Sequence, residues 1–169
     1  EDARLYSDLR LRADQLSAVT EVSRVVASIL DLDELLNEVV TLIHERFGYP
    51  LVHLFTLDLS RGKVVYRAGW PPGSPGMTRE GKPVACHGES VLSNDVRQDP
   101  RYRRVEPFAR YAGAELAVPL TFGDNVLGVL DVQSDQEEAF DEDDRLLFEA
   151  LADSVAIAIR NANLYQSER

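Results

Sequence analysis

The chain is 169 residues long and acidic, with 29 Asp and Glu against 18 Lys and Arg and a net charge of −11 at pH 7. This charge opposes binding to nucleic acid, the single cysteine excludes a disulfide within the chain, and no apolar run approaches the roughly 20 residues of a membrane span. With 44% hydrophobic and 28% charged residues, the composition indicates one globular domain, and the charged N-terminus without an apolar leader predicts a cytoplasmic protein.

A long first helix is predicted over residues 3–30, which contain no Gly or Pro. Apolar residues recur there in the 4-3 spacing of a coiled-coil seam. The alternative is an amphipathic helix packed on its own domain, and we expect a mixture of the two, with residues 19–30 covered. Because residues 1–12 are too polar for a core, we interpret 1–15 as a linker or signalling helix, 16–165 as the domain, and 166–169 as the start of an outgoing linker. The seam positions are Leu5, Leu9, Arg12, Leu16, Val19, Ser23, Val26 and Leu30, of which Arg12 and Ser23 are the weak points.

A second helix and a first β-hairpin follow. Asp31 is a candidate N-cap for a helix over 33–47, and Gly48 is a candidate stop. Strands are predicted over 51–58 and 63–68, joined by a short turn.

A second hairpin is predicted over 115–122 and 125–133, with Gly123 and Asp124 in its turn. Both strands are almost continuously apolar, which predicts that both faces of the sheet are covered. The fold class is therefore α+β, a sheet with helices packed on it.

The last helix is predicted to begin after Phe140, with Asp141 as its cap and Asp144 three residues further on. An apolar face follows, and no stop signal precedes the end of the sequence.

Several segments, in this order and spacing, resemble the GAF domain family. They are GDNVLGVLDVQS (123–134), FDEDD (140–144) and LADSVAIAIRNANLY (151–165), together with 19–47, 88–96, 99–102 and 117–120. The resemblance implies a central six-stranded antiparallel sheet with the N- and C-terminal helices on one face. On the other face it implies a ligand cavity roofed by loops and short helices. The chain departs from the family pattern at 70–89, a short Pro-rich segment, so the alternative is a closed cavity.

If the cavity is present, we expect it to bind a small apolar or amphipathic ligand. Strand alternation places His53 on the same face as Phe55. The alternative is that the aromatic residues fill the core and that His53 is a hydrogen-bonded core histidine. The expected ligand-binding residues are His53, Phe55, Tyr66, Trp70, Phe108, Tyr111 and Glu115, with Asp95 near the mouth.

We expect no catalytic residues, and therefore no enzyme. Cys86 beside His87 could form a reactive thiol or carry a bilin, as in phytochrome-related members of the family, but the neighbouring residues favour an inert thiol. Free methionine sulfoxide reductases, which share the fold, exchange thiols between several cysteines, and this chain has one.

The cofactor is not identified by the sequence. The three histidines lack metal-ligand spacing, which disfavours a metal site, and a haem-ligating His53 is disfavoured as well. His44 is expected on the solvent side of its helix. Phe140 and Asp144 keep part of a cyclic-nucleotide motif of the family, but its Asn-Lys part has no match, which disfavours cyclic nucleotides.

The sequence near residues 3–6 (ARLY) is echoed at 162–165 (ANLY), which suggests that such domains follow one another in an array. We expect a homodimer through the terminal helices and a sensory domain that signals to an output domain in the same polypeptide, such as the histidine kinase of a two-component system. The alternatives are a ligand-free dimerisation spacer and, third, a thiol enzyme using Cys86. The residues expected in the dimer or signalling helices are Leu5, Leu9, Leu16, Val19, Leu151 and Ala158.

Overall fold

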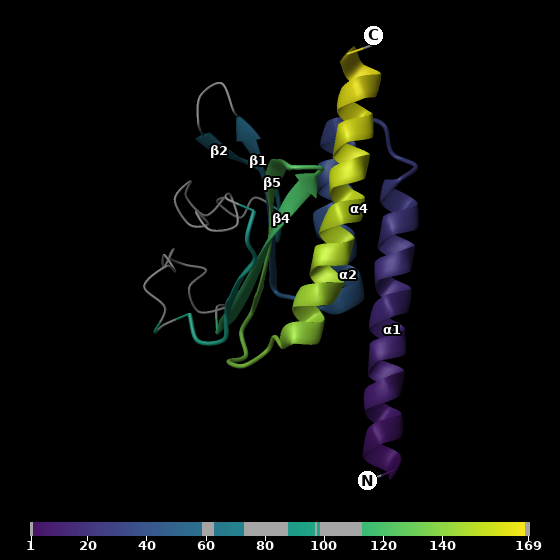
Figure 1. Cartoon of the computed structure of the whole chain (residues 1–169), viewed down its shortest axis with the longest axis vertical. Coiled ribbons are helices and arrows are strands. Elements are labelled where there is room, and N and C mark those ends of the chain that lie inside the picture. Colours follow the sequence, from purple (N-terminus) through teal and green to yellow (C-terminus); the bar gives the residue numbers. More distant parts are fainter. Residues whose placement is uncertain (1, 59–62, 73–87, 97, 99–112, 168–169) are drawn as a thin grey trace.

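The computed structural model describes residues 2–58, 63–72, 88–96, 98 and 113–167 (Figure 1). The sheet of these residues has five strands in the order β2-β1-β5-β4-β3, and every neighbouring pair is antiparallel. The α+β fold is confirmed, although five strands are seen where six were expected. The elements are α1 (Asp2–Val26), α2 (Leu32–Phe47), β1 (Leu51–Asp58), β2 (Lys63–Trp70), β3 (Val91–Ser93), β4 (Ala114–Phe122), β5 (Asn125–Ser134) and α4 (Glu142–Ser167).

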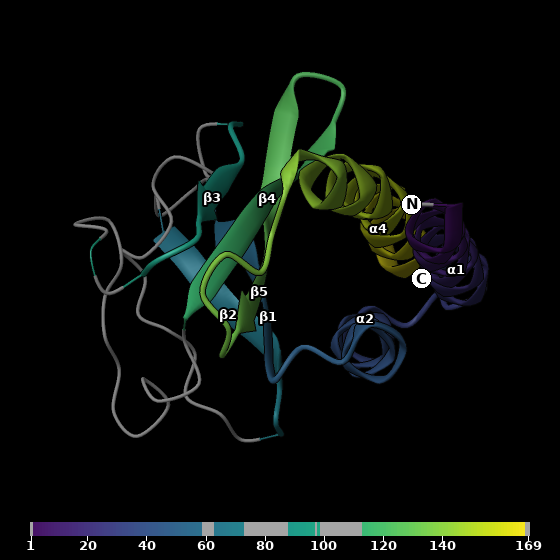
Figure 2. The same cartoon turned by 90° about the horizontal axis from the view of Figure 1, so that it is seen from below.

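The helices form two layers on one face of the sheet (Figure 2). α4 packs on β4 and α2 packs on β1 and β2, while α1 lies outermost against α4 and α2. The main core fills the space between sheet and helices, and the strands contribute to it with alternate residues such as Leu54, Leu116 and Leu130. None of the described helices is long and apolar enough to cross a membrane.

α1 ends at Val26, earlier than the expected residue 30. Ser28 and Ile29 donate their backbone N–H groups to the carbonyls three residues before them, which tightens the last turn. The chain must then become extended, because Asp31 caps α2 with φ −79° and ψ 122° and accepts a hydrogen bond from the Glu34 N–H. The predicted cap of α2 is therefore confirmed, and its position explains why α1 stops.

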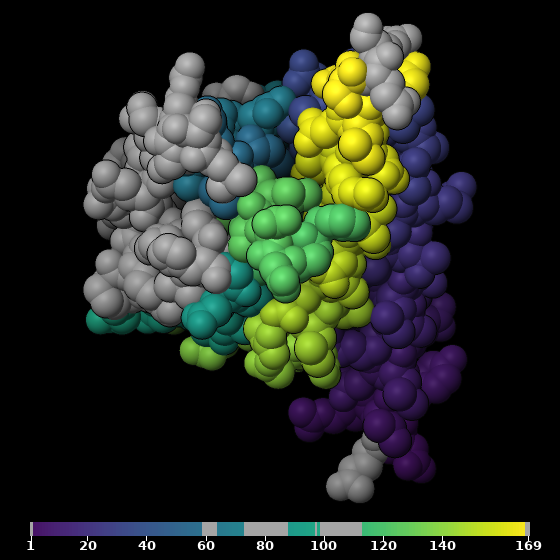
Figure 3. Space-filling model, turned by 45° about the horizontal axis from the view of Figure 1, so that its top comes forward, coloured from purple at the N-terminus to yellow at the C-terminus, as the bar shows by residue number. Residues whose placement is uncertain are grey.

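α1 and α4 run side by side in the same direction but are staggered (Figures 1 and 3). The first half of α1 extends beyond the start of α4 at one end of the molecule, and the last turns of α4 extend beyond α1 at the other. α1 contributes Val22 and Val26 to the core and packs Val19 against it, whereas its apolar side chains from residue 3 to residue 16 are exposed. Leu5, Leu9, Leu11 and Leu16 are each more than half exposed.

Candidate functional site

A cluster of polar side chains lies on the sheet face that points away from the helices. His53, Glu115, Asp131 and Gln133 are 2%, 3%, 0% and 0% exposed. The strand register places His53 opposite Asp131 and Glu115 opposite Gln133. The Gln133 side-chain amide donates a hydrogen bond of 2.9 Å to Asp131 Oδ2, and His53 Nδ1 lies 3.8 Å from the same oxygen. Four polar side chains buried together on one face of the sheet are a candidate functional site. These four residues are here called the sheet-face cluster.

Aromatic and apolar side chains border the sheet-face cluster. The rings of Phe55 and Tyr66 meet edge to face at 5.9 Å between centroids, and the His53 ring lies 6.4 Å and 5.9 Å from them. The site therefore combines carboxylate and amide oxygens with an apolar wall. The apolar wall is a second hydrophobic cluster, separate from the main core. It consists of Phe55, Val91, Ala117 and Val129, with Val64 and Tyr66 packed against it.

Trp70 does not join this wall, contrary to the expectation from sequence. β2 carries a bulge: Leu54 pairs with Ala68, but the next residue, Phe55, pairs with Tyr66. Arg67 is the extra residue, and it interrupts the alternation of faces along β2, so that side chains before it and after it at even positions lie on opposite faces of the sheet. Tyr66 therefore lies with the sheet-face cluster, whereas Ala68 and Trp70 belong to the main core.

His44 also differs from its expected solvent-side position, because its ring stacks on Trp70 at 4.5 Å between centroids and its Nδ1 lies 2.7 Å from the Tyr49 carbonyl. Asp95 follows β3 and is half-buried, and its carbonyl accepts a hydrogen bond from the Gln98 N–H.

Four other residues considered in the sequence, Phe108, Tyr111, Cys86 and His87, lie outside the described residues. Within the described ranges, no group of three or more His, Cys, Asp or Glu side chains is arranged to hold a metal ion.

Asp131 and Gln133 were missed by the sequence reasoning. The strand 125–133 was interpreted as apolar throughout. Residues two positions apart in a strand point to the same face of the sheet, so Asp131 and Gln133 could have been expected to lie side by side. Buried polar side chains at that spacing require polar partners on the neighbouring strands, so this pattern could have pointed to the cluster.

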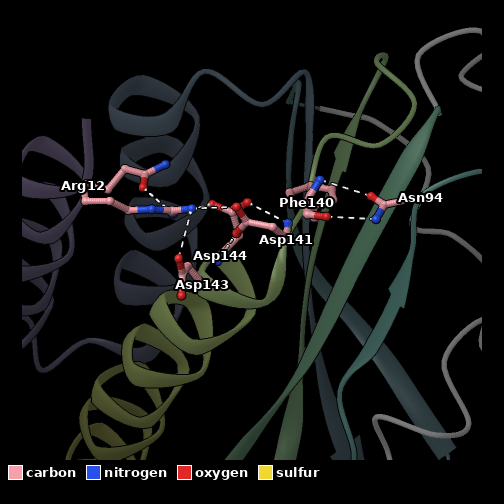
Figure 4. Close-up of polar contacts among 7 residues, drawn as sticks. Arg12, Asn94, Phe140, Asp141, Asp143 and Asp144 are labelled. Carbon is pink, nitrogen blue, oxygen red and sulfur yellow. Dashed lines mark hydrogen bonds and ion pairs between the residues drawn. The ribbon is translucent and has the colours of Figure 1, made fainter. Parts of the chain in front are cut away.

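A second polar cluster joins α1 to the start of α4 (Figure 4). The guanidinium of Arg12 lies 2.6 Å from Asp141, 3.3 Å from Asp144 and 3.5 Å from Asp143. Asp141 and Asp144 also cap the helix reciprocally, since each backbone N–H donates to the other's carboxylate at 2.9 Å. The cap predicted at Asp141 is confirmed. The arrangement of Arg12 with these acids is here called the Arg12 clasp.

Asn94 holds the chain immediately before the Arg12 clasp (Figure 4). Its side-chain amide donates to the Phe140 carbonyl at 2.8 Å, and its side-chain oxygen accepts from the Phe140 N–H at 3.1 Å. The Asn94 carbonyl accepts from Glu138 N–H at 2.9 Å. Glu138 adopts a left-handed backbone with φ 58°, and Phe140 is buried against the Tyr49 ring. The turn into α4 is thereby fixed to the end of β3.

The two capping acids have opposite pKa shifts. Burial raises the pKa of Asp144, and the side-chain hydrogen bond and negative charge of Asp141 act in the same direction, against the hydrogen bond from the Asp141 backbone N–H. Burial acts in the same direction on Asp141, but hydrogen bonds from Asp144 and the charge of Arg12 outweigh it, so that the pKa of Asp141 lies below its ordinary value.

An antiparallel sheet with its helices on one face is an α+β arrangement, and GAF domains have this fold. A profile of the GAF domain family matches residues 29–160, and the chain therefore belongs to the GAF domain family.

Curated relatives include the DNA-binding transcriptional activator HyfR of Escherichia coli (strain K12), 27% identical over 170 residues, which cover 91% of this chain and 25% of that protein. Another is the formate hydrogenlyase transcriptional activator of Salmonella typhimurium (strain SL1344), 26% identical over 175 residues, which cover 95% of this chain and 25% of that protein. The chain thus spans about a quarter of the length of these relatives.

Solved structures with the same fold include the GAF domain from a phosphoenolpyruvate-protein phosphotransferase of Coxiella burnetii. Its TM-score is 0.80 at 21% identity, with 92% of this chain and 98% of that chain covered. Another is the free methionine-R-sulfoxide reductase of Neisseria meningitidis in complex with its substrate, with a TM-score of 0.76 at 23% identity and 88% and 89% of the two chains covered. These likenesses establish the fold.

Proposed function

We propose that this GAF domain is a non-catalytic sensory module that binds a small molecule over the sheet-face cluster and signals through its terminal helices. The observation that carries the proposal is the burial of His53, Glu115, Asp131 and Gln133 together on the face away from the helices. Charged groups are retained in such a position when they serve a ligand or a specific network.

The chemistry of the site favours an amphipathic ligand. Two carboxylates, Glu115 and Asp131, would accept hydrogen bonds from amine or hydroxyl groups, while Phe55 and Tyr66 would contact an apolar portion. A compact molecule with a cationic or hydroxylated end and a hydrocarbon or aromatic end matches both features.

The output domain is proposed to activate transcription. The relatives that support this are named as transcriptional activators, and the match covers about a quarter of each. This favours a transcriptional output over the histidine kinase that the sequence suggested. Any DNA contact is assigned to another part of such a protein, because the present chain carries a net charge of −11.

We further propose that the domain forms a homodimer along α1 and α4. A groove of about 450 Å³ runs between these helices and is lined mainly by apolar atoms. On α4, Leu151 and Ala158 are buried in the core of the single chain, so the exposed Leu146 and Ile157 replace them as contact residues. The groove is lined by Arg12, Leu16, Asp143, Leu146, Leu147 and Ala150.

The domain boundaries are proposed as residues 16–165, with a signalling helix before and an outgoing helix after. α1 is continuous from Asp2 to Val26 and so crosses the first boundary without a break. A ligand-free spacer is the alternative function, and the ligand experiment separates the two.

The experiment is a thermal-shift screen of amphipathic amines, amino acids and hydroxy acids. At a ligand concentration of about 100 times Kd, binding stabilises a protein by about 2.7 kcal/mol. For a domain of this size that raises Tm by about 5–10 °C. Glu115→Gln combined with Asp131→Asn is expected to abolish the shift. Asp124→Asn, which removes an exposed carboxylate from the β4–β5 turn, is the matched control and should retain it.

A compound that shifts the double variant as strongly as the wild type would move the site away from the sheet-face cluster. A screen without any shift, together with a native mass equal to that of a dimer of the bare polypeptide, would favour the spacer.

A further inference from the structure

The sheet-face cluster and the Arg12 clasp are connected through the end of β3. Ser93, the last residue of β3, is buried and pairs in register with Glu115 of the sheet-face cluster. Asn94 is the next residue, and its side chain makes the paired hydrogen bonds to Phe140. A displacement of β3 relative to β4 must therefore move Phe140 or break these two bonds.

Phe140 passes such a displacement directly to the clasp. Asp141 follows it in the chain, caps α4, and makes the shortest of the contacts to Arg12 at 2.6 Å. Arg12 comes from α1, 129 positions away in the sequence. These residues therefore form a continuous set of contacts from a strand of the candidate site to the outermost helix (Figure 4).

The position of Arg12 along α1 allows the Arg12 clasp to restrain the first half of this helix. The buried anchors of α1 are Val22 and Val26, and Arg12 lies about 15 Å along the helix axis from Val22 at a rise of 1.5 Å per residue. The clasp thus holds α1 at a point about 15 Å from the nearer of its two buried anchors. Its loss would leave the first half of α1 free to move about those anchors.

We propose that Asn94, Phe140, the Asp141–Asp144 cap and Arg12 form a relay that couples the sheet-face site to the position of α1. The coupling is intrinsic to the domain, while its use in signalling rests on the proposed sensory function. When β3 shifts on ligand binding, the turn at Phe140 shifts with it, the acids change their position relative to Arg12, and α1 is released or held.

A purely local role for the cap accounts for fewer of the contacts. Asp141 and Asp144 would stabilise the first turn of α4 without any other residue. Local capping requires neither the paired bonds from Asn94, which is 46 positions away, nor the ion pairs from another helix. A relay requires energetic coupling between its two ends, and this coupling can be measured.

The test is a double-mutant cycle read out by hydrogen exchange, with no ligand present. Exchange is followed by mass spectrometry in peptides that cover residues 8–20, for the wild type, Asn94→Ala, Arg12→Gln and the double variant. Each single change is expected to speed exchange in α1 by between about two- and tenfold, the range that corresponds to loss of one hydrogen bond. The double variant is expected to exchange no faster than Arg12→Gln alone, because the clasp is already open.

Two controls isolate the relay. Ser90→Ala removes the 2.6 Å bond from Ser90 to Glu149, another tie between the β3 region and α4 that bypasses Arg12. Arg145→Gln removes an arginine that pairs with Glu142 and Glu149 within α4. Neither control is expected to change exchange in residues 8–20. If circular dichroism shows that Asn94→Ala is unfolded, Asn94→Asp replaces it, because it keeps the acceptor for the Phe140 N–H.

Two results overturn the proposal. In the first, Asn94→Ala or its replacement loosens the start of α4 but leaves α1 unchanged. In the second, the effects of Asn94 and Arg12 on α1 multiply independently. Neither result would bear on the ligand proposal. Conversely, if the cycle shows coupling but the thermal-shift screen finds no ligand, the relay would be supported and the ligand proposal rejected.

Discussion

At Gly128, β5 passes so close to β1 that a Cβ atom would lie 2.1 Å from the Phe55 carbonyl oxygen. No side chain fits there without separating the two strands that carry His53 and Asp131. A single missing side chain therefore sets the distance between the central strands of the candidate site.

We expect Gly128→Ala to destabilise the domain by about 3 kcal/mol, because the clash is with backbone rather than with a flexible side chain. Gly123→Ala is the control: its φ of +61° is unfavourable for alanine, but the Cβ would meet nothing within 4 Å, so the cost should be about 1 kcal/mol. Urea unfolding measures both. A Gly128→Ala variant no less stable than Gly123→Ala would show that β1 and β5 separate easily.

The Arg12 clasp gives a pH-dependent stability. The lowered pKa of Asp141 means that its contribution is complete above its ordinary value of 3.8 and is lost as the pH falls through the lower folded value. The raised pKa of Asp144 acts oppositely, since stability is lost as the pH rises from 3.8 through the higher folded value. Arg12 lowers the pKa of both acids, so it stabilises the charged forms of both.

We therefore expect Arg12→Gln to destabilise the domain by about 0.5–1 kcal/mol at pH 7, the range for a partly exposed ion pair. The difference from wild type should shrink below about pH 4, where protonation of the acids removes the attraction. Urea unfolding at pH 7 and pH 3 measures it. A difference that is equal at both pH values would mean that Arg12 acts through packing rather than through charge.

At the scale of elements, α1 and α4 leave apolar side chains unpaired within the described monomer. Leu146 is 53% exposed and Ile157 48% exposed, and both lie on the α4 side that faces away from the core. Apolar helix faces of this kind are typical of contacts between subunits.

We expect the domain to sediment at twice the monomer mass of 18.9 kDa, and Leu16→Glu combined with Leu146→Glu to produce monomers, because both residues line the α1–α4 groove. Val65→Glu, at an exposed apolar position on β2, is the control and should remain dimeric. Analytical ultracentrifugation measures all three. A wild type that is monomeric at the highest soluble concentration would remove the dimer from the proposal.

At the scale of the whole molecule, sequence reasoning recovered the elements better than the site. The span of β1 was predicted at its observed bounds, and α2 was predicted to within one residue, because Asp31 and Gly48 are strong local signals. The five strands pair in the antiparallel manner that the two predicted hairpins required.

Contacts that depend on tertiary structure could not be predicted from the sequence. The bulge in β2 has no composition signal and moved Trp70 to the helix face. Arg12 was interpreted as a defect in a seam, because its partners lie about 130 residues away and become visible only when α4 is placed beside α1. Asp131 and Gln133 were hidden within an apolar strand, and only their partners on β1 and β4 identify them as a cluster.

The staggered, parallel arrangement of α1 and α4 also limits which motions can pass through the domain. The axes of two packed helices lie about 8–10 Å apart, so α1 and α4 are parallel but not collinear. Turning α1 about its own axis would swing Arg12 sideways across the start of α4 instead of twisting α4. If the terminal helices signal as proposed, α4 would therefore respond to lateral or axial displacement of α1 and not to its rotation.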